Sequence, residues 1–435
     1  MATRTRATRG GPLAGLPKPL RDEVERLGRA DIMVGIPSFK NAATIGYVVR
    51  AAHAGLVQYF PDLRPILVNA DAGSPDGTQR VVVETEPPDY IEEILLVRPR
   101  NRLQRMSLTY PEVDGVGGKG AALRTLFRIA RALEVQALVV VDSDLRSIGP
   151  EWIELLAGPI LKGGFDYVTP LYARHKFDGT ITNTVTYPLT RALYGLRIRQ
   201  PIGGDFGVSG DLVAHYLEQD DWTPEVSRFG IDIWMTVNAI AGGFAVCQAR
   251  LGAKVHDPKD PGTDLGPMFG QVVATALRLA ERHDDRWLGV QGSRDVPAYG
   301  FERLVDPPPL DVDAARLQET FRAAPAEHGA TWTLALGREL AAAVGRLAGK
   351  RGDFRFPDET WARVVYGAVL AHRHGVVPDE GLIAALVPLY FGRVASHVRE
   401  TAELSGDEAE AVVERQARAF ESVKPEFVER WRAGS

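Results

Sequence analysis

Two carboxylates end an apolar run in the first half of the chain, at Asp142 and Asp144 in Val139-Val-Val-Asp-Ser-Asp144. In open α/β sheets, ligands bind at the carboxyl ends of the strands, so both side chains can approach one bound group. Carboxylate oxygens are ligands that Mg²⁺ and Mn²⁺ prefer, and such an ion neutralises a diphosphate. The pattern indicates a metal and diphosphate site, with an ordinary surface turn as an equally weighted alternative.

A glycine-rich segment with one lysine, Gly117-Gly-Lys-Gly120, comes before that run. It is not a Walker phosphate loop, because Lys119 is followed by Gly rather than Ser or Thr, and it does not fit the Gly-x-Gly-x-x-Gly dinucleotide pattern. A glycine-rich helix N-terminus with a lysine suits the phosphates or polar groups of a nucleotide. The alternative is a flexible turn, which explains most isolated segments of this kind.

Three further regions of the chain carry polar side chains in glycine-rich or loop-like surroundings. Residues 71–78 (Asp-Ala-Gly-Ser-Pro-Asp-Gly-Thr) favour tight turns that expose backbone N–H groups. Residues 203–210 (Gly-Gly-Asp-Phe-Gly-Val-Ser-Gly) admit a ligand close to the backbone, and Asp205 is placed to bind hydroxyl groups. Later segments contribute Asp232 and His256, although a lone histidine is more often structural than a ligand.

The elements that position these motifs follow an α/β pattern. Short β-branched runs alternate with amphipathic stretches from residue 30 onward, which is typical of βαβ units around a mostly parallel sheet. We predict strands at residues 30–37, 65–70, 93–97, 137–141 and 165–169. Helices are predicted over about 45–56, with Asn41 as the N-cap, and over about 119–133.

The last third of the chain changes character after Pro307-Pro-Pro309. We predict helices over residues 312–324, 331–348, 358–374, 379–404 and 406–431, with Asp358 as the N-cap of the third. We expect three parts: a flexible basic tail over 1–28, an α/β domain over 29–300 and a helical region over 301–435. A packed helical appendage is the favoured interpretation of the last part, and a cover for the α/β domain or an oligomer contact are the alternatives.

Composition and charge exclude several classes of protein. The chain has 435 residues, a net charge of −5 and a single cysteine, Cys247. A net negative charge argues against nucleic acid as the main partner, and one cysteine excludes an internal disulfide framework and a Cys-rich zinc site. The continuous apolar runs are far shorter than the roughly 20 residues of a membrane span, and the N-terminus lacks the apolar core of a secretory signal. We expect a soluble, cytoplasmic protein.

The order of the motifs resembles one known group of enzymes. The first strand ends at Pro37, and the chain continues through DAGSPDGT, GGKG, VDSDL, GGDFGVSG and FGIDI to a later histidine. This order resembles the nucleotide-sugar glycosyltransferases of the GT-A fold, and more narrowly the retaining glucosyl-3-phosphoglycerate synthase and glucosylglycerate synthase group, with mannosylglycerate-forming relatives. The resemblance covers about residues 30–282 and implies a GT-A, Rossmann-like mixed sheet within 29–300.

The resemblance also implies roles for individual residues. The nucleotide-sugar donor would be bound by Pro37, Ser74, Lys119, Asp142, Ser143 and Gly204. Mg²⁺ or Mn²⁺ would be held by Asp144 and His256 together with the diphosphate. The catalytic carboxylates beside the transferred sugar would be Asp232 and Asp205. An anionic acceptor would be bound by Arg174, Lys254 and Lys259, since cations pair with carboxylates.

Some positions depart from the pattern of this group. Lys40 and Asn41 stand where Asn and Glu are usual, and Asp232 replaces the commoner Glu. Asp257 and Asp260 would repel an acceptor phosphate. The expected reaction is transfer of glucose from a nucleoside-diphosphate glucose to the 2-hydroxyl of D-glycerate, with retention of configuration. Transfer to 3-phosphoglycerate and transfer of mannose are the alternatives.

Other classes of function were weighed against this resemblance. An inverting polyprenyl-phosphate sugar transferase would need a membrane-facing basic amphipathic helix, and we find none in the sequence. A nucleotidyltransferase would need a glycine-rich loop directly after the first strand, which is missing. A non-catalytic, nucleotide-sugar-binding regulatory protein would keep the fold, but the presence of Lys119, Asp142, Asp144 and His256 disfavours it. A homodimer formed through the helical region is expected by analogy.

Overall fold

The computed structural model describes residues 11–86, 99–112, 115–255, 265–302, 307, 309–350 and 354–434. The predicted strand at 93–97 lies outside these residues. The chain forms two compact units, which divide it differently from the predicted boundaries after residues 28 and 300. The sheet unit holds the chain up to Pro170 with Gly204–Arg228 and Phe244–Ala249, and the helical unit holds Leu171–Gly203, Phe229–Gly243 and the chain from Arg250 onward.

The sheet has the strand order β10-β8-β5-β7-β4-β1-β2-β3. Its strands are β1 (Ile32–Ser38), β2 (Pro65–Asp71), β3 (Gln104–Thr109), β4 (Ala137–Val140), β5 (Tyr167–Ala173), β7 (Phe206–Ser209), β8 (Val246–Ala253) and β10 (Ala298–Tyr299). Strand β1 runs parallel to β2 and β4, and β2 runs parallel to β3, whereas β7 is antiparallel to β4 and β5. The chain passes into the helical unit within β5 and again within β8.

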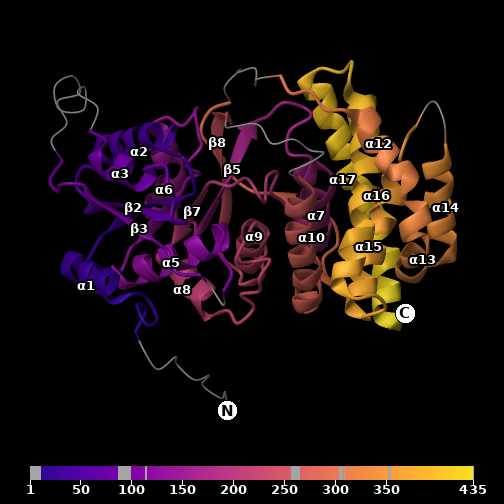
Figure 1. Ribbon diagram of the computed structural model, residues 1–435, viewed down its shortest axis with the longest axis horizontal. Helices are drawn as coiled ribbons and strands as arrows, with labels where there is room; N and C mark the ends of the chain where they lie inside the picture. Colours follow the sequence, from indigo (N-terminus) through magenta and orange to yellow (C-terminus); the bar gives the residue numbers. More distant parts are fainter. Residues whose placement is uncertain are drawn as a thin grey trace, which may run out of the picture. The chain divides into compact units, whose positions relative to one another are not determined.

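Helices cover both faces of the sheet unit, as Figure 1 shows. On one face lie α2 (Ile45–Tyr59), α3 (Thr78–Glu84) and α6 (Glu151–Gly163), and on the other lie α1 (Lys18–Leu27), α5 (Lys119–Ala132) and α8 (Gly210–Glu218). Every residue of β1, β2 and β4 is buried, as expected for strands covered on both sides. Cys247 in β8 is also fully buried, and this burial raises the pKa of its thiol to about 12. The predicted α/β fold is confirmed.

Two local predictions for the sheet unit are wrong. Helix α1 lies in the predicted flexible tail, because Leu20 and Val24, one helical turn apart, are both buried. Asn41 does not cap α2, whose N-cap is Thr44. The carbonyl of Asn41 instead accepts the N–H groups of Thr44 and Ile45, so a turn comes before the helix.

The helical unit contains most of the C-terminal half of the chain. Its elements are η1 (Thr182–Thr186, a π-helix), α7 (Tyr187–Tyr194), α9 (Ile231–Ala241), α10 (Leu265–Arg282), α11 (Asp284–Trp287), α12 (Ala314–Ala323), α13 (Pro325–Leu336), α14 (Arg338–Gly349), α15 (Asp358–Arg373), α16 (Asp379–Thr401) and α17 (Gly406–Ala433). A short parallel pair joins β6 (Leu196–Arg197) to β9 (Arg294–Asp295). The predicted helical character of the C-terminal region is confirmed.

Two details of the predicted helices are wrong. The helix predicted over 331–348 is two helices, α13 and α14, which meet at Gly337 with a φ of 84°, a conformation that favours glycine. Asp358 is not an N-cap, since Pro357 occupies that position. The carboxylate of Asp358 instead lies 2.7 Å from Arg393 and 2.7 Å from Arg415, in an ion-pair cluster of the helical unit.

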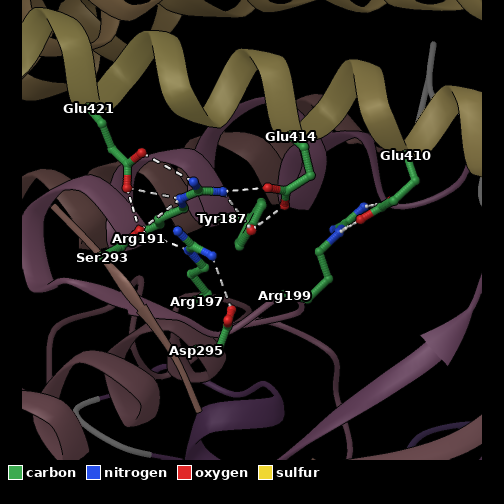
Figure 2. Close-up of polar contacts among 9 residues, drawn as sticks. All are labelled: Tyr187, Arg191, Arg197, Arg199, Ser293, Asp295, Glu410, Glu414 and Glu421. Carbon is green, nitrogen blue, oxygen red and sulfur yellow. Dashed lines mark hydrogen bonds and ion pairs between the residues drawn. The ribbon is translucent and has the colours of Figure 1, made fainter.

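A row of glutamates holds α17 to the elements around α7 (Figure 2). Glu414 and Glu421 both pair with the buried Arg191, at 2.6 and 3.0 Å, and Glu414 also accepts the hydroxyl of Tyr187. Glu410 pairs with Arg199 through two hydrogen bonds of 2.6 and 2.8 Å. Arginine forks that bind carboxylates at two points are geometrically specific, so these contacts determine which face of α17 is turned inward.

Helix α16 is long and apolar enough to cross a membrane by length and composition alone. However, 78% of its most apolar window is buried inside the structure. It packs against α10, α12 and α13, all within the helical unit. The apolar side chains of α16 therefore form part of the core of that unit.

We predict that the protein loses stability in mild acid because of His397 in α16. Burial, reinforced by Arg393, lowers the pKa of His397 to about 4, and Nε2 donates to the carbonyl of Lys176 at 3.2 Å. Because the unfolded chain takes up this proton near pH 6.5 and the folded chain only near pH 4, the free energy of unfolding falls as pH drops through this window, by about 1–3 kcal/mol.

Thermal unfolding of His397→Gln, followed between pH 7.5 and 4.5, checks this prediction. Glutamine can donate to the same carbonyl but does not titrate, so its unfolding temperature should fall less steeply with acid than that of the wild type. Parallel pH curves for the two proteins would show that His397 is not responsible.

Candidate functional site

The turn after β4 is held by a lysine and a buried carboxylate. Lys119, the first residue of α5, places Nζ 3.0 Å from Oδ1 of Asp142 and 3.2 Å from the carbonyl oxygen of Gly204. The backbone N–H of Asp142 donates to Oδ1 of Asp205 at 2.7 Å. Four of the predicted site residues are therefore brought together by direct contacts within the sheet unit. The lysine compensates the charge of Asp142 at the carboxyl end of the sheet.

Asp205 has a different contact from the one predicted. We expected it to bind ligand hydroxyls, but its side chain is fully buried and supports the backbone of the Asp142 turn. The glycines that follow it were expected to admit a ligand. Residues 206–209 instead form β7, where an added Cβ at Gly207 would lie 2.0 Å from the carbonyl oxygen of Leu156. At Gly210, it would lie 2.3 Å from the carbonyl oxygen of Val135. These two glycines allow close packing inside the protein.

The glycines around Lys119 also serve packing. Gly118 has a φ of 152°, and an added Cβ would lie 2.8 Å from the carbonyl oxygen of Ser227. At Gly120, an added Cβ would lie only 1.8 Å from the carbonyl oxygen of Val226. The N–H of Gly120 donates to the carbonyl of Arg228 at 3.2 Å. The segment is therefore a closely packed helix start rather than a flexible turn. This packing determines where α5 begins and so where Lys119 lies.

Substitution of Gly120 by alanine is expected to destabilise the protein strongly. The Cβ would overlap backbone that cannot move as a side chain can, and overpacking of this kind costs about 1–3 kcal/mol or more. We expect Gly120→Ala to lower the unfolding temperature by several degrees and to weaken donor binding. The matched control is Gly345→Ala in α14, where the added Cβ meets open space and alanine favours the helix. A Gly120→Ala protein as stable as the control would contradict the packing argument.

The turn at 71–78 binds the loop after β1. Ser74 Oγ, Thr78 Oγ1 and Asp76 Oδ2 accept the backbone N–H groups of residues 40, 41 and 42, at 2.8, 2.9 and 3.1 Å. The sequence predicted exposed N–H groups on this turn. In the structure its side chains accept N–H groups from a neighbouring loop, in which Lys40 has a φ of 57°.

Asp71 is the anchor of that turn. Its carboxylate accepts hydrogen bonds from Ser74, Ser38 and Gln79, at distances between 2.6 and 3.1 Å. Burial alone would raise the pKa of Asp71, but these hydrogen bonds outweigh it and hold the pKa below its ordinary value. Ser74 also accepts the N–H of Lys40. The side chain of Ser74, which is predicted to bind the nucleotide-sugar donor, is therefore held at two points.

Asn41 connects the same loop to the Asp142 turn. Its Oδ1 accepts the hydroxyl of Ser143 at 2.9 Å, and the carbonyl of Ser143 accepts the hydroxyl of Thr44 at 2.9 Å. The predicted donor residues Ser74 and Ser143 thus belong to one hydrogen-bonded set of loops in the sheet unit. Pro37, the remaining predicted donor residue, is buried in β1 beside Ala70 of β2. Sequence reasoning did not find the structural role of Asn41, which only the fold reveals.

In the helical unit, two predicted acceptor residues share one aromatic ring. Arg174 and Lys254 lie over the ring of Tyr172, with the guanidinium carbon 5.3 Å and Nζ 5.2 Å from its centroid. Nε of Arg174 donates to Gln200, and Nζ of Lys254 donates to the carbonyl of Gly203 at 2.9 Å. Two cationic side chains therefore lie over one ring, and the carboxylate of Asp178 pairs with Arg174 at 3.0 Å.

Asp232 lies in the first turn of α9 and is largely buried. The same helix donates a hydrogen bond of 2.6 Å from Thr236 to the carbonyl of Pro201. Gln200, in turn, donates to the carbonyl of Tyr172 at 2.9 Å. The segment 200–203 is thus bound from α9, from Tyr172 and from Lys254, and the chain enters the sheet unit directly after it, at Gly204.

Two predicted site residues, His256 and Lys259, lie outside the described residues, as do Asp257 and Asp260. Among the residues that the structure describes, no three His, Cys, Asp or Glu side chains form a group that could hold a metal ion. Asp144 is partly exposed in the turn after β4. Asp142, two residues before Asp144, forms an ion pair with Lys119. A carboxylate oxygen in this position fits Mg²⁺ or Mn²⁺ by its chemistry. A shallow hollow of about 690 Å³ between α12, α13 and α16 contains no predicted site residue.

Comparison with known proteins supports the class that the sequence predicts, a glycosyltransferase. No family model matches the chain. Glucosyl-3-phosphoglycerate synthase of Petrotoga mobilis is 24% identical to it over 266 residues, which are 58% of this chain and 74% of that protein. The resemblance to the glucosyl-3-phosphoglycerate synthase group is confirmed by this relative.

Solved structures of glucosyl-3-phosphoglycerate synthase from Mycobacterium tuberculosis are also similar to the chain. One, in complex with Mg²⁺ and UDP, is 25% identical, covers 60% of this chain and 83% of that one, and has a TM-score of 0.44. Another, in complex with Mn²⁺, UDP-glucose and phosphoglyceric acid, is 27% identical over the same shares, with a TM-score of 0.44.

Proposed function

We propose that the protein transfers glucose from a nucleoside-diphosphate glucose to D-glycerate, with retention of configuration, to form glucosylglycerate. The observation that carries this proposal is the cluster of Lys119, Asp142, Gly204 and Asp205 at the end of β4, which assembles predicted donor residues by direct contacts. The curated relative, whose name states glucosyl transfer to a phosphoglycerate, supports the same type of reaction.

The donor side of the reaction is assigned to the sheet unit. Ser74 and Ser143 are positioned by Asp71 and Asn41, and Lys119 presents its charge beside Asp142. Asp144 and His256 would hold Mg²⁺ or Mn²⁺, and such an ion supplies Lewis-acid stabilisation of the leaving diphosphate. The buried Asp205 positions the backbone of the turn that carries these carboxylates. We assign it a positioning role rather than contact with the sugar.

The acceptor side is assigned to the helical unit. Arg174 and Lys254 lie over the ring of Tyr172 and would bind the carboxylate of glycerate, Arg174 in exchange for its ion pair with Asp178. Lys259 would add to it, whereas Asp257 and Asp260 would disfavour a second anionic group on the acceptor. Asp232 would contact the transferred sugar from the first turn of α9. We further propose that the enzyme acts in the cytoplasm and as a homodimer.

A second acceptor, 3-phosphoglycerate, is favoured by the name of the Petrotoga relative. The cations around Tyr172 could bind its carboxylate in the same way, so the two acceptors differ in where the phosphate would be placed. Free glycerate is the proposed acceptor because of Asp257 and Asp260. A direct comparison of the two acceptors decides between them.

An NMR product assay tests the proposed function. The purified protein is incubated with Mg²⁺ or Mn²⁺, with UDP-, ADP- and GDP-glucose and GDP-mannose in turn, and with either D-glycerate or 3-phosphoglycerate. An α-anomeric glucosylglycerate, formed faster than its phosphorylated counterpart, is the expected result. Donor hydrolysis without transfer to either acceptor would contradict the assignment of a glycerate acceptor, and a β-anomeric product would contradict retention.

A further inference from the structure

A chain of hydrogen bonds leads from α17 to Arg174, entirely within the helical unit. Glu410 binds Arg199 through the two-point contact described above, and Nη2 of Arg199 also donates to Oδ1 of Asn183 at 2.8 Å. Nδ2 of Asn183 donates to the carbonyl of Asp178 at 3.1 Å. The carboxylate of Asp178 lies 3.0 Å from Arg174. Figure 2 shows the first of these contacts, with Glu410 reaching Arg199 from α17.

The loop from 174 to 180, which follows β5, is also held by α16 and by the segment after it. Nζ of Lys176 donates to the carbonyls of Ala402 and Leu404, at 2.6 and 2.7 Å. The ring of His397 donates to the carbonyl of Lys176, and the hydroxyls of Thr180 and Tyr390 lie 2.6 Å apart. The loop is thus attached to the C-terminal helices at its centre and at its end.

The π-helix η1 explains why helices from the C-terminal region are needed at this point. Pro188 has no N–H, so it cannot donate to the carbonyls of Asn183 and Thr184, which precede it by five and four residues. Side chains of the C-terminal helices replace that donor. Gln416 of α17 donates to the carbonyl of Asn183 at 2.7 Å, and Trp361 of α15 donates to the carbonyl of Thr184 at 2.6 Å.

We infer that the C-terminal helices position the acceptor-binding loop, with Arg199 and Glu410 as the positioning residues that connect α17 to Arg174. This inference rests on the proposed function, because it takes Arg174 to bind the acceptor. It gives the region from α15 to α17 a part in the reaction, beyond that of a packed appendage. Neither Arg199 nor Glu410 is assigned a contact with the substrate; they act through Asn183 and Asp178.

The test is a comparison of Glu410→Gln and Arg199→Lys with a control on the same helix. Glu410 is 47% exposed and pairs with Arg199, whereas Glu426 is 49% exposed and pairs with Arg363 at 3.0 Å. Arg363 is on α15 and is not part of the chain of hydrogen bonds from Glu410 to Arg174. Glu426→Gln therefore removes a similar α17 ion pair without disturbing the connection to Arg174.

We expect the KM for the acceptor to rise about 5- to 10-fold in Glu410→Gln and in Arg199→Lys, with the KM for the donor unchanged. Lysine at position 199 cannot reproduce the two-point contact of the guanidinium, so its effect should be at least as large. Glu426→Gln should leave both KM values unchanged. A rise of both KM values together, accompanied by a lower unfolding temperature, would show a merely structural role and overturn the inference.

Amide hydrogen exchange separates a failure of this inference from a failure of the proposed function, since it needs no substrate. Exchange of the backbone amides at 174–180 should quicken several-fold in Glu410→Gln and Arg199→Lys, but not in Glu426→Gln. Unchanged exchange in both variants would overturn the inference even if the enzyme transfers glucose. If exchange is faster in the variants but the enzyme uses neither D-glycerate nor 3-phosphoglycerate, the inferred positioning of the loop would stand and the proposed acceptor would be refuted.

Discussion

Asp144→Asn is expected to lower kcat for glucosyl transfer by about 10²–10³-fold or more. Asparagine keeps the size of the side chain at the end of β4 but removes the negative charge that would hold Mg²⁺ or Mn²⁺. Loss of a group that stabilises charge in the transition state has effects of this order. The fold should survive, because Asp144 is partly exposed and the contacts of Asp142, Lys119 and Asp205 are unaltered.

Rates measured across a titration of Mn²⁺, together with calorimetric binding of UDP with and without the ion, check this prediction. The wild type should bind UDP more tightly when the ion is present, and Asp144→Asn should lose most of this difference. Asp62→Asn is the control, since that carboxylate forms an exposed ion pair with Arg100. Activity within tenfold of the wild type, with the same dependence on the ion, would remove Asp144 from the metal site.

Asp232→Asn is expected to lower kcat by about 10²-fold with little change in stability. In the proposed reaction the carboxylate contacts the transferred sugar, whose anomeric carbon gains positive charge as the donor breaks, so a neutral amide stabilises that state less. Asp232 is the second residue of α9, where a negative charge also interacts with the helix dipole. That interaction is worth about 0.3–1 kcal/mol, and asparagine keeps the size of this buried side chain, so its packing is preserved.

The helix-dipole contribution has a matched control in Asp211→Asn. Asp211 is the second residue of α8, so this substitution removes the same charge from the same helical position. Asp211 is exposed whereas Asp232 is buried, so Asp211→Asn measures the helix-dipole contribution alone, and only Asp232→Asn should lower kcat. A kcat for Asp232→Asn within threefold of that for Asp211→Asn would mean that Asp232 has no part in catalysis.

The sequence predicted those strands and helices whose burial leaves a simple pattern. Strands β1, β2 and β4 are apolar throughout because helices cover both faces, and their positions were predicted to within two residues. Strand β3, Gln104–Thr109, was missed because polar residues alternate with buried Met106 and Leu108 along it. Strand β7 was missed because its glycine-rich sequence is also typical of a loop.

The candidate site was predicted as a set of residues but not as a set of contacts. The pairing of Lys119 with Asp142 joins residues 23 positions apart, and the bond from Asp142 to Asp205 joins residues 63 positions apart. No local pattern encodes such distances. The burial of Asp205 and the packing of Gly118 and Gly120 likewise depend on backbone from elsewhere in the chain, so the sequence could not separate ligand-binding glycines from packing glycines.

The burial of Cys247 makes the protein convenient for site-specific labelling. Thiol reagents react with the exposed thiolate, and Cys247 is fully enclosed with a pKa of about 12, so it should remain unmodified in the native protein at pH 7.5. Cysteines introduced at exposed positions can then be labelled with fluorescent dyes while the native residue is kept.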